Sequence, residues 1–140
     1  MSNEIMSLNE KFDAGFYTGV AETVEEKKTL YNGITNQTGP LSDTKGKTLK
    51  VVNFYCEVIA MDSDIKDDDG NTITIKEPAT RIVIFTDDGK AYGCVSSGIK
   101  NSLMKICQIY GMPAEWEEPL QVTLKEINRN KNRIYTFELV

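Results

Sequence analysis

The segment TRIVIFTDDGKAYGCVS, residues Thr80–Ser96, decides the fold because it has the pattern of a β-hairpin. Two runs rich in β-branched and aromatic residues, Thr80–Thr86 and Lys90–Ser96, flank the turn sequence Asp87-Asp88-Gly89. An Asp-Gly turn between such runs is a strong hairpin signal. Side chains alternate along a strand, which puts Ile82 and Ile84 on one face and Arg81, Val83 and Phe85 on the other. We therefore expect two adjacent antiparallel strands here.

A helix and two more strands follow this hairpin. Ser96 and Ser97 can cap a helix from about Gly98 to Tyr110, whose apolar residues recur at three- and four-residue spacing before Gly111-Met112-Pro113 ends it. The segments 120–127 and 133–140 then alternate as strands around a turn at 128–132. The spacing predicts a helix with one buried face.

The chain before the hairpin predicts a helix and a long strand. Thr23 can cap a helix at about 22–35, which Glu25 and Glu26 favour near its N-terminus. The run 47–61 contains no Gly or Pro and is long for a strand. An Asp-rich loop then leads to Asn71, after which TITIK alternates until Pro78 interrupts it. Residues 1–17 suggest a flexible N-terminal arm or one loosely docked strand.

The resulting order is long strand, strand, strand, helix, strand, strand, with an extra helix in front. A helix between the third and fourth strands plugs one end of the barrel in the OB-fold, a five-stranded Greek-key barrel. We predict an all-β fold with accessory helices: a single OB-fold domain over 18–140, with the N-terminal helix at about 22–35 and the barrel at about 47–140. An open α+β sheet also fits these elements and stays as an alternative.

Composition narrows the function classes. The chain has no histidine, which removes the usual general base and the commonest metal ligand. The acidic loop fails as an EF-hand because, with Gly70 at loop position 6, positions 1 and 12 fall on Ile65 and Lys76. We expect no enzyme activity, no cofactor and no metal site. Three cysteines among apolar neighbours suggest reduced core residues, and no stretch suggests a signal peptide or membrane span, which favours the cytoplasm.

The charge is unevenly distributed. The net charge is −5, but five aspartates between Asp62 and Asp69, offset only by Lys66, contribute −4 of it. Four basic residues between Lys125 and Arg133 face a single acid, Glu126. A local basic surface therefore remains compatible with a nucleic-acid partner.

Three segments, in order, carry a resemblance to a known family. They are GKTLKVVNFYCEV, TRIVIFTDDGKAYGCVSSGIKNSL and IYGMPAEWEEPLQVTL, preceded by EEKKTLYNGITN and an LSD step. Over about Thr18–Val140 the chain resembles the single-stranded DNA-binding proteins encoded by phages and mobile elements of bacteria. The resemblance implies coating of single-stranded DNA with little sequence preference, during phage or plasmid replication or transfer.

Single strands are held by aromatic rings that stack on bases within a basic groove. Tyr92 is our first candidate, since Ala91 and Gly93 beside it are small, although packing at the barrel mouth is an equal alternative. Tyr55 should face outward while Phe54 faces the core. The remaining candidates are cations and rings on the predicted strands and last turn: Arg81, Phe85, Lys90, Arg129, Lys131, Arg133 and Tyr135. Burial of Arg81 and Phe85 under the N-terminal helix remains an alternative for these two residues. A basic turn without function remains an alternative for the last hairpin.

A second class of function stays open. The chain could instead be an OB-fold protein-interaction module of a replication or conjugation complex, using its acidic loop or a sheet edge. A carboxylate-dependent nuclease is a distant third reading. The sequence also leaves open whether the chain forms a homo-oligomer.

Overall fold

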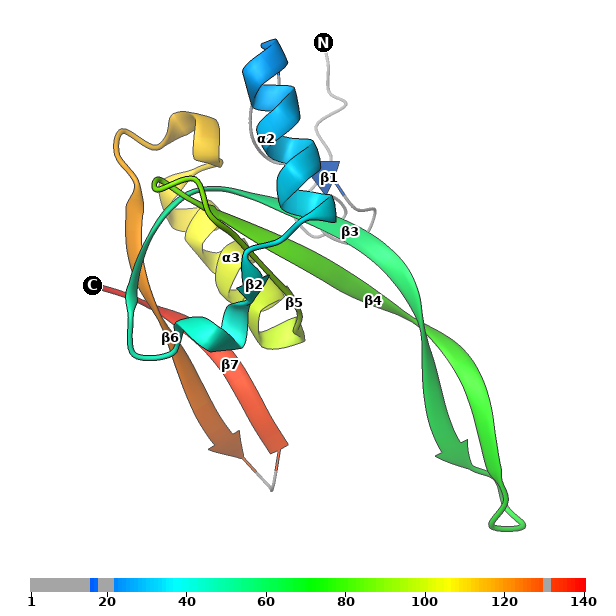
Figure 1. Cartoon of the computed structure of the whole chain (residues 1–140). Helices are drawn as coiled ribbons and strands as arrows, with labels where there is room; N and C mark the ends of the chain where they lie inside the picture. Colours follow the sequence, from blue (N-terminus) through cyan, green and yellow to red (C-terminus); the bar gives the residue numbers. More distant parts are fainter. Residues whose placement is uncertain (1–15, 18–21, 130–131) are drawn as a thin grey trace, which may run out of the picture.

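A computed structural model describes residues 16–17, 22–129 and 132–140. These residues form one curled half-barrel sheet with two α-helices, so the prediction of an all-β, OB-like fold with accessory helices is confirmed (Figure 1). The elements, which include two short 3-10 helices (η), are β1 Phe16–Tyr17, α2 Val24–Thr35, β2 Gly39–Pro40, η1 Leu41–Thr44, β3 Thr48–Lys66, β4 Thr72–Thr86, β5 Ala91–Val95, α3 Ser97–Tyr110, η2 Pro113–Glu115, β6 Leu120–Arg129 and β7 Asn132–Leu139. The segment 1–15, in the predicted flexible arm, lies outside the described residues.

The sheet is open along one seam. Its strand order is β2-β5-β4-β3-β6-β7, and β1 pairs with β3 beside it. Within the described part of the chain no ladder joins β5 to β7, whereas a closed barrel would pair two such strands. The sheet is therefore a partly open barrel with its seam between β5 and β7.

The inner face of the sheet carries the main core. Phe54, Cys56, Ile82 and Ile84 are fully buried there. Helix α3 covers this face with Ile99, Leu103 and Cys107. It begins at Ser96, whose hydroxyl accepts from the Ile99 N–H, and ends at Gly111, whose φ is 84°. The predicted caps of this helix and the inward orientation of Phe54 are confirmed.

Helix α2 packs on the outer face of the same strands. Its capping box joins Thr23 and Glu26, with backbone-to-side-chain distances of 3.0 and 3.1 Å. Leu30 packs on a second cluster, formed by Val83, Phe85 and Ala91. The outer face of β4 and β5 is thus covered where α2 crosses it.

The Asp-rich segment is strand as far as Lys66 and a turn from Asp67 to Asn71, which corrects the first half of the predicted loop. Strands β3 and β4 pair from Cys56–Ile82 out to Lys66–Thr72 and form a long two-stranded arm, β3–β4 beyond Cys56, that projects from the body (Figure 1). Asp62 faces Lys76 with 2.8 Å between Oδ1 and Nζ, and Asp64 accepts from Thr74 at 2.7 Å. Opposite charges and polar partners across the ribbon allow these aspartates to lie in strands.

Pro78 lies inside β4, opposite Ala60, so the predicted interruption there is wrong. A proline can lie in this strand because one edge of β4 has no partner strand in the described part of the arm. Strand β5 pairs only with residues 81–85 of β4, so in the described structure nothing pairs with the other edge of β4 at Pro78. A proline is tolerated where its missing N–H would point away from the ladder.

Candidate nucleic-acid interface

Tyr55 and Arg81 lie on the outer face, as predicted, but both are engaged by neighbours. The half-buried Tyr55 donates its hydroxyl to Glu57 Oε2 at 2.6 Å. This hydrogen bond, followed by burial and the charge of Glu57, raises the pKa of Tyr55 to about 12. Arg81 lies opposite Glu57 on β4, and its Nη2 donates to the Ile34 carbonyl at 2.8 Å. Arg81 therefore ties the C-terminal end of α2 to the sheet.

Phe85 is buried, which removes it as an accessible stacking ring. Only 5% of the residue is exposed, and α2 lies over its ring. A Cβ built on Gly33 of α2 would be 2.6 Å from Phe85 Cζ, so only a glycine permits this approach. The face shared by Arg81 and Phe85 was predicted correctly, but the helix rather than DNA covers the ring.

Tyr92 lies on the inner face, which favours packing of its ring, one of the two alternatives for this residue, over stacking on a base. It pairs with Ile84, is half-buried and packs against the main core. The residues on either side of Tyr92 are small because of contacts on the outer face of the strand. Ala91 lies in the cluster under α2, and a Cβ on Gly93 would be 2.7 Å from Gln37 Nε2. Small residues therefore admit α2 and the segment after it, and the ring of Tyr92 remains only half-accessible.

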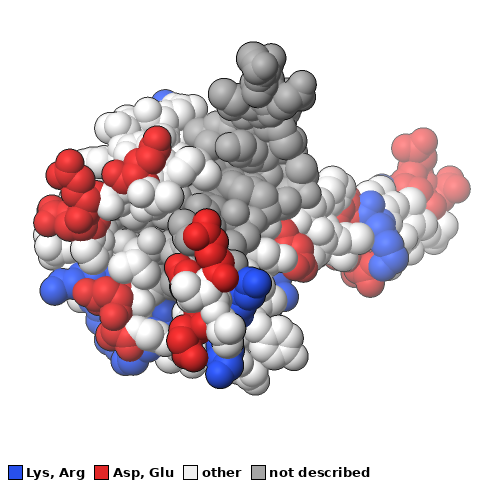
Figure 2. Space-filling model, turned by 90° about the horizontal axis from the view of Figure 1, so that it is seen from above, with Lys and Arg blue, Asp and Glu red and all other residues white. Residues whose placement is uncertain are grey.

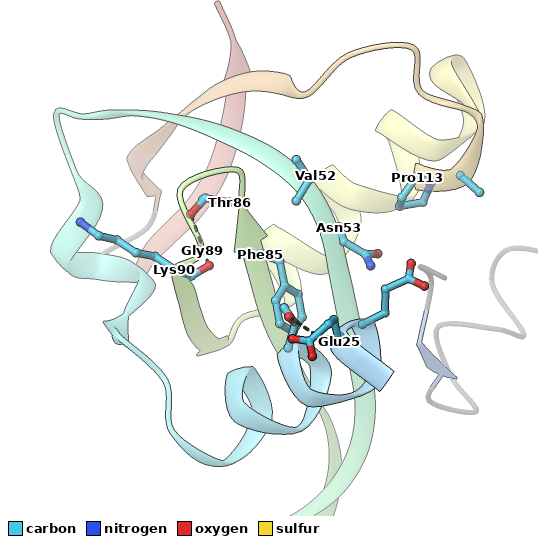
Figure 3. Close-up of a pocket in the computed structure, with 11 residues that line it drawn as sticks. Glu25, Val52, Asn53, Phe85, Thr86, Gly89, Lys90 and Pro113 are labelled. Atoms are coloured by element: carbon cyan, nitrogen blue, oxygen red, sulfur yellow. Dashed lines mark hydrogen bonds between the residues drawn. The ribbon is translucent and has the colours of Figure 1, made fainter. Parts of the chain in front are cut away.

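Lys90 borders a cavity of about 370 Å³ (Figure 3). The floor of this cavity is apolar, with Val52, Phe85 and Pro113 among its lining residues, whereas Glu25 and Glu26 line it from α2. Lys90 Nζ is 3.9 Å from Asp88 Oδ2, at the turn that precedes β5. Two carboxylates beside one lysine make this cavity a poor site for a phosphate.

The β6–β7 hairpin brings cations and a ring to the open seam. Arg133 Nε is 2.7 Å from Glu126 Oε1, and Lys45 Nζ is 3.4 Å from Glu126 Oε2. The hydrogen bond to Tyr135, followed by the charge of Glu126, raises the pKa of Arg133. Tyr135 is half-buried and packs on the core from the inner face. One carboxylate thus holds two cations beside an aromatic ring.

A cavity of about 230 Å³ lies along this seam, and Tyr135, Leu124 and Cys94 are among its lining residues. It is smaller than typical small-molecule pockets, which span ~300–1,000 Å³. Arg129 ends β6, but its side chain lies outside the described part of the structure, and so does all of Lys131. The backbone places Arg129 at the end of β6, opposite Asn132 of β7. We call Lys45, Arg129, Arg133 and Tyr135 the hairpin site, and Lys131 stays a prediction.

Sequence reasoning missed two residues. Lys45 follows η1 in a segment read as a loop, and only the fold brings it to Glu126, 81 positions along the chain. Tyr31 is 65% exposed on α2, four residues after Lys27 and three after Lys28. The apolar pattern of this helix groups Tyr31 with Leu30 and Ile34 in one stripe, so no local signal marks it as an accessible ring.

Trp116, the buried cysteines and the acidic end of the arm are poor candidates for contacts with nucleic acid. Trp116 donates Nε1 to the Gly111 carbonyl at 2.9 Å and packs on the core. Burial raises the pKa of Cys56 and of Cys94 to about 12, so both thiols stay protonated at neutral pH. Figure 2 shows acidic side chains gathered at the end of the arm, where a nucleic-acid backbone would be repelled.

Across the described ranges, no helix is long and apolar enough to cross a membrane, and no group of three or more His, Cys, Asp or Glu residues could hold a metal ion. No curated protein and no solved structure matches the chain. A family model described as phage single-stranded DNA-binding protein matches residues 6–139, nearly the whole chain. This protein, whose half-barrel carries cations and a tyrosine at its open seam, therefore belongs to the family of phage single-stranded DNA-binding proteins.

Proposed function

We propose that this protein coats single-stranded DNA with little sequence preference during phage DNA replication, in the cytoplasm of the bacterial host and without catalysis. The family membership supports single-stranded DNA as the ligand. The DNA contacts the hairpin site in this proposal, because the site combines an aromatic ring, an apolar cavity and several cations. This combination is what sequence-tolerant binding of single strands needs.

In this proposal a base packs against Tyr135 at the seam while the neighbouring phosphates take the place of Glu126. Lys45 and Arg133 share one carboxylate in the DNA-free protein, with 46% and 65% of their side chains exposed. A phosphate can accept from both cations when Glu126 is displaced. Neutralised phosphates release counterions, so the affinity should fall as salt rises.

The first test is a fluorescence titration of labelled oligo-dT with the matching duplex as competitor, at several salt concentrations. Replacing Tyr135 by leucine removes the ring and should weaken binding roughly 5- to 150-fold, which corresponds to ~1–3 kcal/mol per stacked base. Tyr135→Phe keeps the ring and loses only the hydroxyl, so it should bind much like the wild type. Equal binding by the leucine and wild-type proteins would show that no base stacks here.

A second test separates the seam from the outer face. Glu126→Gln removes the carboxylate that competes with phosphate for Lys45 and Arg133, so it should tighten DNA binding and steepen its salt dependence. Glu57→Gln makes the same change beside Tyr55 and Arg81 on the outer face. Tighter binding by Glu57→Gln, with no effect of Glu126→Gln, would move the interface to the outer face. The candidates Tyr55, Arg81, Lys90 and Tyr92 stay predictions until this comparison is made.

The projecting arm favours a protein contact as an additional function. From Asp62 to Glu77 it carries six carboxylates against Lys66 and Lys76, a net charge of −4. Such a surface suits a basic partner in a replication or transfer complex better than it suits DNA. Replacing Asp67–Asp69 by asparagines should leave oligo-dT affinity unchanged or slightly raised. A large loss of DNA affinity would contradict this division of roles.

A further inference from the structure

The apolar stripe of α3 continues past the part of the helix that the sheet covers. Leu103 and Ile106 are buried in this stripe, whereas Tyr110, four residues after Ile106, is 48% exposed. Ile109, next to Tyr110 in the last turn, is 69% exposed. An amphipathic helix normally turns its apolar stripe toward other protein atoms. The last turn of α3 therefore presents an exposed apolar surface.

Two hollows meet at this surface, at the end of the body that lies away from the arm (Figure 1). One hollow, of about 290 Å³, lies toward β7, and Lys105 and Leu139 are among its lining residues. The other, of about 360 Å³, lies toward the segment after η2, which contributes Glu117 and Glu118. The two exposed residues of the last turn line both hollows, so the surface is continuous. We call this surface the α3 face; it consists of Lys105, Ile109, Tyr110, Glu117, Glu118 and Leu139.

The α3 face has opposite charges on the two sides of its apolar centre. Lys105 lies on one side, whereas Glu117 and Glu118 lie on the other. All three residues are exposed. An apolar centre with a charged rim is the usual composition of an interface between proteins. The two carboxylates would repel a nucleic-acid backbone, so the face suits a protein partner better than it suits DNA.

This arrangement of charges is complementary to itself. In a dimer with two-fold symmetry the same surface patch of both copies meets, and positions on either side of the axis contact each other. An axis through the apolar centre would bring Lys105 of one copy to Glu117 and Glu118 of the partner subunit, twice in each dimer. Ile109 and Tyr110 would then pack against the apolar centre of the other copy, out of contact with water. We propose that the protein forms a two-fold symmetric dimer through the α3 face.

The α3 face is separate from the hairpin site. The first turn of α3 lies at the seam, where Ser96 and Ile99 line the cavity beside Tyr135. Because an α-helix rises ~1.5 Å per residue, Ile109 lies about 15 Å further along the helix than Ile99. Dimerisation through the α3 face would therefore leave the seam accessible to DNA.

Sedimentation velocity of the full-length protein, without DNA, tests the dimer. The weight-average mass should rise from one chain toward two as the protein concentration is raised. Ile109→Glu places a charge at the apolar centre and should raise the dissociation constant of the dimer by more than about tenfold. The matched control is Val24→Glu, which makes a similar change at a residue of α2 that is 67% exposed, and it should dimerise like the wild type.

Two results of this experiment would overturn the proposal. A wild-type protein that stays monomeric at every concentration would leave the α3 face to a different protein. Equal dimerisation by the wild type and Ile109→Glu would show that the copies meet at another surface. Circular dichroism verifies that both variants are folded, and the exposure of Ile109 means that its replacement does not disturb the core.

An exchange of charges tests the two-fold arrangement itself. Lys105→Glu makes both sides of the face acidic, whereas Glu117→Lys combined with Glu118→Lys makes both sides basic. Each of these proteins alone should dimerise more weakly than the wild type, because like charges then meet across the axis. An equal mixture of the two should recover dimers, since each side then meets a side of opposite charge. A mixture that dimerises no better than its separate components would overturn the proposal.

Discussion

The contact between Gly33 and Phe85 predicts that Gly33→Ala destabilises the protein although alanine favours helices. Alanine gains ~1 kcal/mol over glycine in a helix interior. Against this, the new methyl group would lie 2.6 Å from Phe85 Cζ and 3.2 Å from the Ala91 side chain. Both neighbours are core residues, exposed by 5% and 6%, so neither can turn away into solvent.

Overpacking of this kind costs ~1–3 kcal/mol. Because a rigid ring lies so close to the new methyl group, we expect a cost at the upper end of this range. The net loss of unfolding free energy should therefore be ~2 kcal/mol. Urea denaturation followed by circular dichroism measures it, with an unchanged m-value as evidence that the fold persists.

Two further variants make this test specific. Asn32→Ala changes an exposed residue on the same helix and should alter stability by no more than ~0.5 kcal/mol. Phe85→Leu in the Gly33→Ala background should cost less than the sum of the single changes, because removal of the ring relieves the clash. A Gly33→Ala protein as stable as the wild type, or additive effects in the double variant, would show that α2 does not pack on Phe85 as described.

Three further predictions concern single residues elsewhere. Gly98→Ala should destabilise the protein more than Gly93→Ala. The methyl group at position 98 would meet the backbone of Tyr135, whereas the one at position 93 would meet the movable end of the Gln37 side chain. Thermal unfolding of the two variants compares their stabilities. Thr23→Ala removes the capping box of α2 and should lower the unfolding free energy by ~1 kcal/mol, as measured in urea, whereas Thr29→Ala on the same helix serves as the control. The phenol of Tyr55 should ionise near pH 12 in an ultraviolet absorbance titration, and Glu57→Gln should lower that pKa. Because folding raises the pKa of Tyr55, the stabilising contribution of its hydrogen bond is complete below about pH 10 and is lost as the pH rises through about 12. If Glu57→Gln left the pKa of Tyr55 unchanged, the assigned cause of the shift would be wrong.

Local sequence signals predicted the parts of the fold that depend on neighbouring residues. The turn at Asp88-Gly89 and the caps at Ser96 and Gly111 fix backbone conformation within a few positions, so the central hairpin and α3 follow from the sequence. The arm did not follow, because clustered aspartates favour a loop when read alone. Their partners Thr74 and Lys76 lie across the ribbon, and only the pairing of β3 with β4 shows that these charges are compensated.

The sequence predicted which residue types form the candidate site, but it did not predict which of their side chains other elements of the fold cover. Alternation correctly put Arg81 and Phe85 on one face, but it could not show that α2 covers that face. Small residues beside Tyr92 suggested an accessible ring, whereas they make room for groups on the other side of the strand. Lys45 carries no local signal, since its distance to Glu126 is set by the path of the whole chain.

Strand β3 changes its register with β4 between Val51 and Asn53. Before this bulge the odd-numbered residue Val51 is buried, and after it the even-numbered residues Phe54 and Cys56 are. Val52 is the extra residue of this bulge, because Val51 lies opposite Thr86 and Asn53 opposite the next residue of β4, Phe85. Loss of Val52 would therefore restore a regular ladder and leave Phe54 inside and Tyr55 outside. Loss of one residue beyond the bulge would instead turn every later side chain over and exchange the two surfaces of the arm.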